Sequence, residues 1–483
     1  MAFTAEQEAK LLQLAEQSTL IFQLLAAYKN GKRINDLPHL GNTNPFDLIL
    51  EVIDTDGETK QSKIAALLPY IEEQCSYGIE WDVTVSPSVC TRIGNMELHR
   101  TVPVQSGMRG CLLSDAGTVV EYLHPTNWKA HKRDGSAGQV MVEIPAHYRK
   151  FTTNGNKRSV RISEYPLPGY HFVSKKYVSA YEAALDRTAG KLCSVVNMGT
   201  QYRGGGNQAD WDGTYRSLLG RPVTAISRTA FRNYARARGA GTQWNCNDYN
   251  AYKDVAWLYY IEYANRNCQL AFNSAKDANG YAQGGLGSGV TTMPDWNGFN
   301  GYYPFVPCGY SDDLGNFSGE VAYVVPKADG GTWATVYVPR YRGIENPFGH
   351  IWKFTDGINI EIKTDADGGT SKVYVADDPA NFNDSNYNGY TMRGLEARAE
   401  GYTKEMIIGT YGEIIPAVVG GGTTVYWCDY HYTNINYNSL RGVLVGGYAD
   451  YGAGAGFGCA SSNNAPSLTT AYVGSRLCFI PKA

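Results

Sequence analysis

The stretch TTVYWCDYHYTNINYNSLRGVLVGGYADYGAGAGFGCASSNNAPSLTTAYVGSRLCFIP, residues 423–481, alternates two kinds of sequence. Short apolar or glycine-bearing pieces, 443–447 and 473–480, predict fixed strands and turns. The pieces between them lack the strict alternation of a half-buried strand, and their side chains are too polar to form a core. We therefore expect them in loops at the surface. Loops dense in Tyr and Asn are typical of recognition surfaces, because Tyr gives rigid contact area and Asn gives adaptable hydrogen bonding.

The predicted binding residues lie in a variable segment at about 426–472, and a glycine-rich surface loop without any function is the alternative. Their expected role is to stack on a ligand and to form hydrogen bonds with it. They are Trp427, Asp429, Tyr430, His431, Tyr432, Asn434, Asn436, Tyr437, Asn438, Asp450, Tyr451, Gly454, Ser462, Asn463, Asn464 and Tyr472.

The composition indicates a loop-rich protein that contains β-structure. The chain has 483 residues, with 54 Gly and 36 Tyr, so it is long enough for several domains and a real core. Its formal net charge of −3 provides no field that would attract nucleic acid. No apolar run approaches the roughly 18 residues needed to span a bilayer, so we expect no membrane insertion. The polar start MAFTAEQEAK does not resemble a secretory signal, and it favours folding in a cytoplasm.

An α+β chain in three parts is the predicted organisation. Residues 1–78 form a helical attachment or oligomerisation region, 79–165 a small β-rich module and 166–483 a ligand-binding domain, with Pro166–Gly169 as the boundary. In the first part, the helix at 4–30 either packs on its own domain or drives self-association. In the β-rich module, Asn154-Gly155 predicts a hairpin turn between 148–153 and 159–163. The expected helices span 4–30, 62–74, 178–185, 229–238 and 254–267.

The residue types that hold metals show no strong pattern in this chain. The ten cysteines are scattered singly, without a CxxC pair, so we expect free buried thiols. Asp384, Asn386, Asn388 and Gly389 match the first half of a calcium loop, but Leu395 stands where an acidic ligand is needed. We therefore expect no cofactor, and we keep a structural calcium at this loop as the alternative.

An ordered set of motifs in residues 166–483 resembles the formylglycine-generating-enzyme-like branch of the C-type lectin fold. Each motif alone is weak, whereas the set in this order is fairly specific. The motifs are Tyr177–Glu182, Pro222-Val223 followed by Ser227 and an Ala/Arg helix, Trp257–Glu262, Gly349–Trp352, Gly446-Gly447 and Gly474–Leu477.

Within that branch the last segment looks most like the variable proteins of diversity-generating retroelements. Their substituted positions hold mainly Asn, Tyr, Asp, His, Ser, Thr, Gly or Ala, as the segment does here. The resemblance implies a receptor-binding protein, or adhesin, of a phage tail fibre, assembled in the host cytoplasm and carried on the virion. Its partners would be a host-cell surface protein or glycan and other phage tail proteins, and a homo-oligomer, with a trimer favoured, would add avidity.

The same resemblance raises an enzymatic alternative, a formylglycine-generating-enzyme-like oxidase. That family needs two cysteines after the Gly-Gly pair, and the corresponding positions here hold Tyr451 and Gly456. Without thiolate ligands the copper that activates oxygen would not be bound. We therefore expect no enzyme, and a purely structural tail protein is the remaining alternative.

Overall fold

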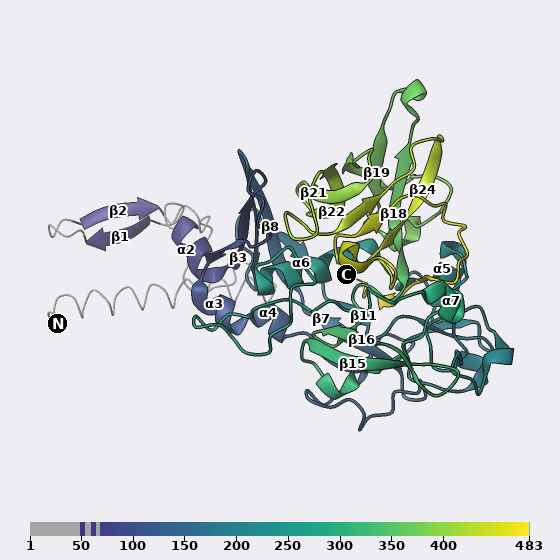
Figure 1. The fold of residues 1–483 in the computed structure, drawn as a ribbon. Coiled ribbons are helices and arrows are strands. Elements are labelled where there is room, and N and C mark those ends of the chain that lie inside the picture. The colour runs from purple at the N-terminus through teal and green to yellow at the C-terminus, as the bar shows by residue number, and fades with distance from the viewer. Residues whose placement is uncertain (1–48, 54–58, 64–67, 483) are drawn as a thin grey trace.

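The computed structural model describes residues 49–53, 59–63 and 68–482, and in these residues strands predominate over helices (Figure 1). The predicted α+β class agrees with the presence of both helices and strands, and strands make up the larger part. The helix expected at 4–30 lies outside the described residues. The α-helices are α2 (Leu68–Cys75), α3 (Met96–Thr101), α4 (Pro103–Ser106), α5 (Arg228–Arg236), α6 (Tyr249–Tyr263) and α7 (Trp296–Asn300). Short 3-10 helices are η4 (Thr200–Tyr202), η5 (Ala209–Trp211), η6 (Asp312–Leu314), η7 (Asp365–Asp367), η8 (Pro379–Asn381) and η9 (Gly452–Gly454).

A five-stranded antiparallel sheet follows α2 and has the order β10-β8-β9-β3-β4. The predicted hairpin is confirmed, because β8 and β9 pair from Asn154 opposite Lys157. Gly155 takes the first place of the two-residue loop with φ 57°, a conformation that favours glycine. The strands are β3 (Tyr77–Asp82), β4 (Thr91–Gly94), β8 (His147–Asn154), β9 (Lys157–Ser163) and β10 (His171–Val173). Before α2, β1 (Ile49–Ile53) pairs with β2 (Thr59–Lys63), so the helix expected at 62–74 is observed only in part.

A six-stranded sheet joins distant parts of the chain in the order β14-β27-β11-β7-β5-β6. Val142 on β7 pairs with Val178 on β11, and Cys478 on β27 pairs with Val178 from the other side. Strands from both sides of the boundary predicted at Pro166–Gly169 therefore belong to one continuous sheet. The boundary does not coincide with a break in packing. The strands are β5 (Arg109–Leu113), β6 (Val119–Tyr122), β7 (Gln139–Ile144), β11 (Lys176–Ser179), β14 (Trp244–Cys246) and β27 (Leu477–Phe479).

The helix expected at 178–185 is wrong. The chain there forms β11 and, after a turn, β12 (Ala184–Asp186), which pairs with β13 (Lys191–Cys193). Every residue of β11 is buried, because the strand lies inside the sheet. A short strand buried on both faces gives an apolar run that cannot be told from a buried helix by periodicity.

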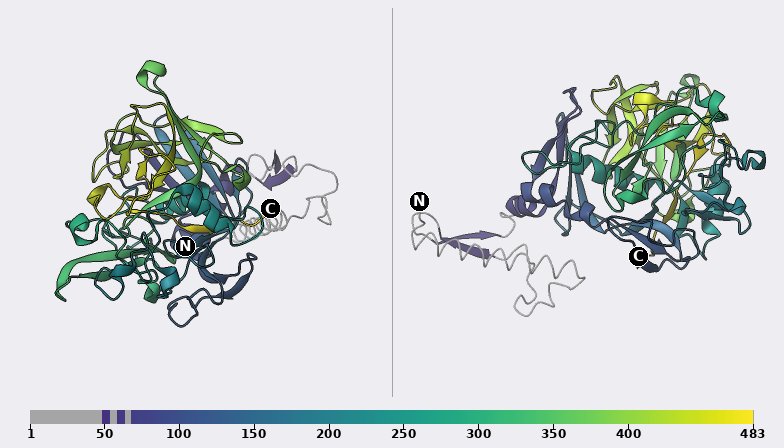
Figure 2. Two further views of the ribbon diagram at one scale, coloured as in Figure 1. Left: turned by 90° about the vertical axis from the view of Figure 1, so that its right-hand side faces the viewer. Right: turned by 60° about the horizontal axis from the view of Figure 1, so that its bottom comes forward.

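The largest sheet has nine strands and contains the strands that the variable segment forms. Its main path runs β20-β19-β18-β24-β25-β23-β21-β22, and β26 pairs with β18. Figure 1 shows the connection between β18 and β19 projecting from the molecule, and in Figure 2, right, these yellow-green strands lie apart from the purple strands of the five-stranded sheet. The strands are β18 (Trp352–Ile362), β19 (Ser371–Val375), β20 (Thr391–Leu395), β21 (Gly401–Ile408), β22 (Glu413–Val419), β23 (Tyr430–Tyr432), β24 (Ser439–Val445), β25 (Ala460–Ser461) and β26 (Val473–Gly474). A separate three-stranded sheet holds β15 (Gly319–Pro326), β16 (Thr332–Tyr341) and β17 (Ile344–Glu345).

Helix α6 lies between the five-stranded and the nine-stranded sheets, and it contacts both β3 and β18. Asp248 caps its N-terminus by accepting a hydrogen bond from the Ala251 N–H at 2.8 Å. The helix was expected at 254–267 and is observed at Tyr249–Tyr263. Nearly every side chain of α6 is buried, so the sequence lacks the amphipathic pattern that would have marked its ends. Helix α5, in contrast, begins after the Ser227 cap, close to its predicted start.

Candidate functional site: a row of tyrosines on the C-terminal segment

The structure divides the predicted binding residues into three groups by exposure. Fully exposed are Asn436, Tyr437, Asn438 and Asp450. Partly exposed are Tyr430, Tyr432, Asn434, Tyr451, Asn463, Asn464 and Tyr472. The expectation of exposure is wrong for five residues, which are Trp427, Asp429, His431, Gly454 and Ser462.

Burial along residues 429–434 alternates strictly, contrary to the expectation that this piece has no strand pattern. Asp429, His431 and Thr433 are buried, and the residues between them are partly exposed. The piece contains β23 (Tyr430–Tyr432), which pairs with β21 and β25. The inward positions are polar and the outward positions are tyrosine or asparagine. The hydropathy of the sequence therefore does not alternate, although the side chains alternate between the two faces of the strand.

The buried polar residues of the variable segment have partners inside the protein. The Asp429 carboxylate accepts a hydrogen bond from the Gly458 N–H at 2.8 Å, and burial raises its pKa well above the usual value. Nε2 of His431 lies 3.1 Å from the Ala397 carbonyl oxygen, and burial lowers its pKa to about 4. The Ser462 hydroxyl donates to Glu396 at 2.8 Å. These side chains hold the strand in place, and they are not available to a ligand.

Trp427 is the clearest correction, because its indole belongs to the central core. Only 1% of it is exposed, and it lies in an aromatic cluster with Trp81, Trp257 and Tyr260. The ring centroids are 5.6, 5.9 and 5.2 Å from that of Trp427, respectively. This tryptophan anchors the start of the variable segment to α6.

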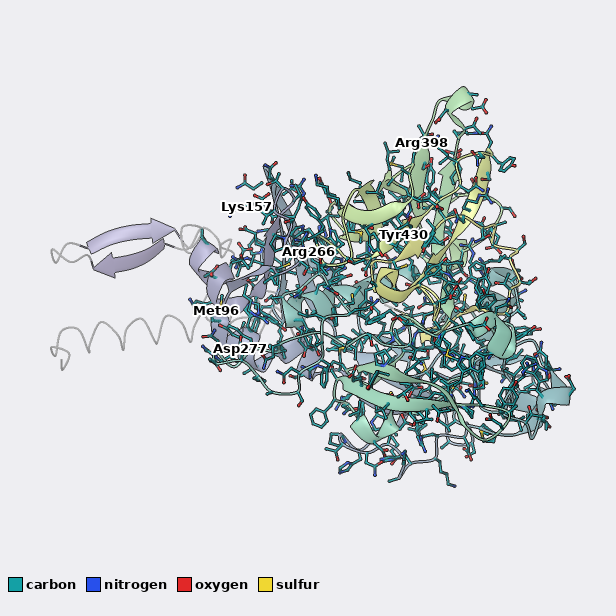
Figure 3. The ribbon with its side chains drawn as sticks, viewed as in Figure 1. Met96, Lys157, Arg266, Asp277, Arg398 and Tyr430 are labelled. Atoms are coloured by element: carbon teal, nitrogen blue, oxygen red, sulfur yellow. The ribbon has the colours of Figure 1, made fainter. Side chains whose placement is uncertain are left out.

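The outward tyrosines of β23 begin an unbroken chain of ring contacts, which we call the tyrosine row. Successive ring centroids along it lie between 4.2 and 5.8 Å apart, and every ring is partly exposed. Figure 3 labels Tyr430 on the nine-stranded sheet. In order of contact the row consists of Tyr402, Tyr430, Tyr432, Tyr451, Tyr448, Tyr472 and Tyr302.

One buried indole supports the middle of the row. Trp352, 2% exposed, begins β18 and contacts Tyr432, Tyr448 and Tyr451, with centroids 6.2, 6.3 and 5.2 Å away. It ends the Gly349–Trp352 motif, so this motif places a rigid aromatic base under the exposed rings. Aromatic pairs at such distances stabilise one another by about 0.5–1.5 kcal/mol beyond the area they bury.

Two adjacent glycines fix the turn from which the row continues after β24. Gly446 and Gly447 have φ values of 90° and 72°, in the region that favours glycine. A Cβ on Gly447 would lie 2.7 Å from the Cβ of Ala455, too close for any real contact. Tyr448 and Tyr451 follow directly, so this turn directs both rings toward the row.

The row presents neutral phenols. Burial is the first cause that raises the pKa of Tyr432, Tyr448 and Tyr451 far above the usual tyrosine value. These hydroxyls therefore stay protonated at any physiological pH. A ligand would meet ring faces together with O–H groups that donate and accept hydrogen bonds.

A groove of about 450 Å³ lies beside the exposed end of the variable segment. Asn438 and Ser439 line one side of it, and Asn386 and Tyr387 line another. Tyr387 stacks on Tyr374 with centroids 4.1 Å apart, which fixes its ring. Amides and an ordered aromatic ring thus line this groove together with the charged residues Glu361 and Lys363.

Asp384, the first residue of the loop kept as the calcium alternative, pairs with two arginines. Its carboxylate accepts hydrogen bonds from Arg228 at 2.7 Å and from Arg232 at 2.6 Å. In the part of the chain that the structure describes, no group of three or more His, Cys, Asp or Glu side chains is arranged to hold a metal ion. Across the same residues, no helix combines the length and the apolar character that crossing a bilayer requires.

Sequence reasoning missed several members of the row. Tyr448 stands directly after the Gly-Gly turn, so its position in the sequence could have identified it. Tyr302 and Tyr402 lie outside the variable segment, and only the fold brings them to it. Conversely, Asn434, Asn463 and Asn464 are partly exposed but do not belong to the row.

Comparison with known proteins gives no family assignment. No family model matches the sequence, and no curated protein matches it. Among solved structures, PvdO from Pseudomonas aeruginosa is 12% identical over 73% of this chain and 100% of that chain, with a TM-score of 0.30. The Major Tropism Determinant U1 variant is 12% identical over 77% of this chain and 71% of that chain, with a TM-score of 0.27. At these TM-scores neither similarity establishes a common fold or function.

Proposed function

We propose that this chain is a receptor-binding protein of a phage tail and that the tyrosine row binds a ligand on the host cell. The observation that carries the proposal is the unbroken contact of partly exposed tyrosines over the buried Trp352. A rigid base under exposed rings lowers the conformational entropy that a ligand must overcome. Tyrosine-rich surfaces of this kind are typical of adaptable binding proteins.

The chemistry of the row favours a target that offers an apolar face together with hydrogen-bonding groups. A glycan and a protein surface both fit this description, and the row contributes no charge to either. In the fuller form of the proposal, the domain is a C-type-lectin-like scaffold of the formylglycine-generating-enzyme-like branch. The outward positions of its variable segment would then be diversified by a retroelement.

Multiple copies of the row would strengthen weak binding. A homo-oligomer, with a trimer favoured, would convert later binding events into intramolecular ones and raise the avidity. The N-terminal residues 1–78 would organise the oligomer and attach it to other tail proteins, and the chain would then lie on the virion tail.

Binding is favoured over the oxidase alternative by the state of the cysteines. All ten are free and buried. Cys459 is the nearest in sequence to the family's cysteine positions, and burial raises its thiol pKa well above the usual value. A copper site needs accessible thiolates, whereas these thiols stay protonated. The chain is therefore proposed not to be an enzyme.

Adsorption to host cells tests the proposal. The double variant Tyr430→Ser with Tyr472→Ser removes two partly exposed rings from the row, and we expect it to lower the affinity for host cells at least about tenfold. The matched control is Tyr337→Ser, which removes a ring that is 42% exposed on β16, in a different sheet. Unchanged adsorption by the correctly folded double variant would favour the purely structural alternative.

A further inference from the structure

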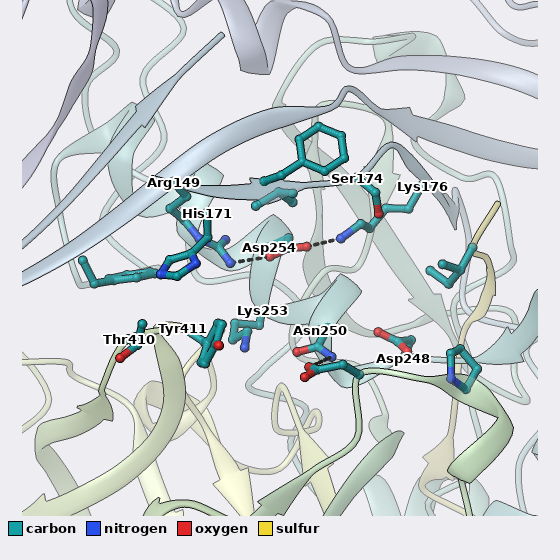
Figure 4. Close-up of a pocket in the computed structure, with 16 residues that line it drawn as sticks. Arg149, His171, Ser174, Lys176, Asp248, Asn250, Lys253, Asp254, Thr410 and Tyr411 are labelled. Carbon is teal, nitrogen blue, oxygen red and sulfur yellow. Dashed lines mark hydrogen bonds and ion pairs between the residues drawn. The ribbon is translucent and has the colours of Figure 1, made fainter. Parts of the chain in front are cut away.

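A second pocket, lined by no residue of the variable segment, has the features of a ligand site. It has a volume of about 340 Å³ and lies among β8, β10 and the start of α6, with residues 377–379 and 410–411 closing its remaining sides (Figure 4). A volume of this size suits a small organic group. The tyrosine row contributes no residue to its lining.

The floor of the pocket holds two cations on one carboxylate. Asp254, on α6, accepts from Arg149 at 2.7 Å and also from Lys176. All three side chains are buried, with 7% of Arg149 and 6% of Lys176 exposed. One carboxylate accepts hydrogen bonds from both cations, so some N–H donors of Arg149 and Lys176 lack an acceptor among the described side chains at this end of the pocket.

One nitrogen of the Arg149 guanidinium is such an unpaired donor. Its Nη1 is buried and has no hydrogen-bond partner among the described residues, although the side chain lines the pocket. A buried N–H of a charged group that lacks an acceptor costs free energy, and such groups normally find a partner. A guanidinium of fixed geometry is suited to a carboxylate, which can accept two hydrogen bonds from it.

The other charges of the pocket are already engaged. Lys253 donates to both oxygens of Glu413 at 3.2 Å. Asp377 pairs with Arg393 at 2.6 Å. Asp248 caps α6, and Figure 4 shows it at the end of the pocket away from Arg149. An anionic group would therefore bind at the Arg149 end, away from Asp248, where the one carboxylate, Asp254, is already paired with two cations.

Aromatic side chains line the mouth. Tyr411 is 43% exposed, and His171 contacts it with ring centroids 5.2 Å apart. His171 is also the cross-strand partner of Arg149, so the two side chains lie on the same face of the sheet. Exposed aromatic rings beside a polar floor suit a ligand with one apolar face.

We propose that this pocket binds an acidic monosaccharide unit, a sugar ring that carries one carboxylate. The carboxylate accepts hydrogen bonds from Arg149, and the ring lies against the aromatic rim. Polar side chains spread over the lining, Ser174, Asn250 and Thr410, match the several hydroxyls of a sugar better than the single ammonium of an amino acid. This site is independent of the tyrosine row and of the function proposed for it.

Calorimetric titration of the full chain tests the assignment, with glucuronic acid as the probe. Glucose keeps the ring without the carboxylate, and glycine keeps a carboxylate without the ring. We expect glucuronic acid to bind at least about tenfold more tightly than either. If glucose binds as tightly as glucuronic acid, the carboxylate contact is wrong. If glycine binds as tightly, the contact with a sugar ring is wrong. If no probe binds, the pocket is not a site of this kind.

Variants locate the binding. Arg149→Lys keeps the charge beside Asp254 but removes the planar fork, and Tyr411→Ala removes a rim ring that is 43% exposed. We expect affinity for glucuronic acid to fall at least about tenfold in the first and severalfold in the second. Lys150→Gln is the matched control, because Lys150 follows Arg149 on β8 and pairs with Glu72 outside the pocket.

Unchanged affinity in both Arg149→Lys and Tyr411→Ala would contradict the site. The Tyr430→Ser and Tyr472→Ser double variant should bind glucuronic acid as the wild type does. Failure of this site and failure of the tyrosine row are therefore distinguishable in the same set of proteins.

Discussion

The ring of Tyr432 stacks on the ring of Tyr451, with centroids 4.7 Å apart and planes inclined by 25°. Tyr432 belongs to β23, and Tyr451 directly precedes η9. This contact joins a strand to a loop in the variable segment, so the two pieces present one surface. The tyrosine row extends from it in both directions.

Replacement of Trp352 tests the base of the row. Trp352→Ala leaves a cavity beneath three tyrosines, and we expect a loss of about 3–5 kcal/mol in the free energy of unfolding. Trp352→Phe keeps an aromatic base and should lose less stability. Chemical denaturation measures both, and equal stability of Trp352→Ala and the wild type would show that the indole does not support the row.

The Gly446-Gly447 turn gives a prediction with an internal control. Gly447→Ala introduces both an unfavourable φ of 72° and a clash 2.7 Å from Ala455. Gly330→Ala has a comparable φ of 82°, but its Cβ would meet nothing within 4 Å. We expect the first substitution to cost about 1–3 kcal/mol more than the second, because only the first overpacks. Equal losses in thermal unfolding would remove the packing argument.

Glu396 predicts a pH dependence of stability. Burial raises its pKa from 4.5 to about 8, against hydrogen bonds from Ser462 and Thr433 that lower it. The unfolded chain releases this proton at lower pH than the folded protein does, so stability falls as the pH rises from about 4.5 to about 8.

The variant Glu396→Gln cannot ionise and lacks this loss. The free energy of unfolding of the variant minus that of the wild type should therefore increase by about 3–5 kcal/mol as the pH rises from 4.5 to 8. Denaturant titrations of both proteins across that range give the difference at each pH. Parallel pH profiles would mean that Glu396 is already ionised in the folded protein.

Sequence variation among sibling isolates should follow the burial pattern. We expect substitutions at outward positions such as Tyr430, Tyr432 and Tyr437, and none at the buried Trp427 and Asp429. The reason is that the buried positions hold the scaffold. Sequencing the gene from related isolates measures this, and an even spread of changes over both sets would contradict a diversified surface.

Much of the β-structure could be predicted from local signals. The Asn154-Gly155 pair predicts the β8–β9 hairpin, and the helix predicted at 229–238 lies close to α5. Helix α6 was misplaced because it is buried on all sides and has no polar face. The sequence predicts a helix at β11 because the strand is buried in the sheet and lacks the alternation of apolar and polar residues.

The site could be predicted only in outline, for a physical reason. Composition identified the segment, but it could not separate Tyr430, whose ring faces outward, from Asp429 and His431, which bond inside the protein. Tyr302 and Tyr402 come from distant parts of the chain, and their place in the row depends on tertiary structure. The pocket at Arg149 likewise depends on strand pairing between β8 and β10.

Protection of tyrosines on host cells tests the central claim most directly. Hydroxyl-radical labelling, read by mass spectrometry with and without host cells, compares Tyr430, Tyr451 and Tyr472 with Tyr337, which is 42% exposed on another sheet. The account predicts that labelling of the three row tyrosines falls on binding while that of Tyr337 is unchanged. Equal labelling of the row in bound and free protein would contradict it.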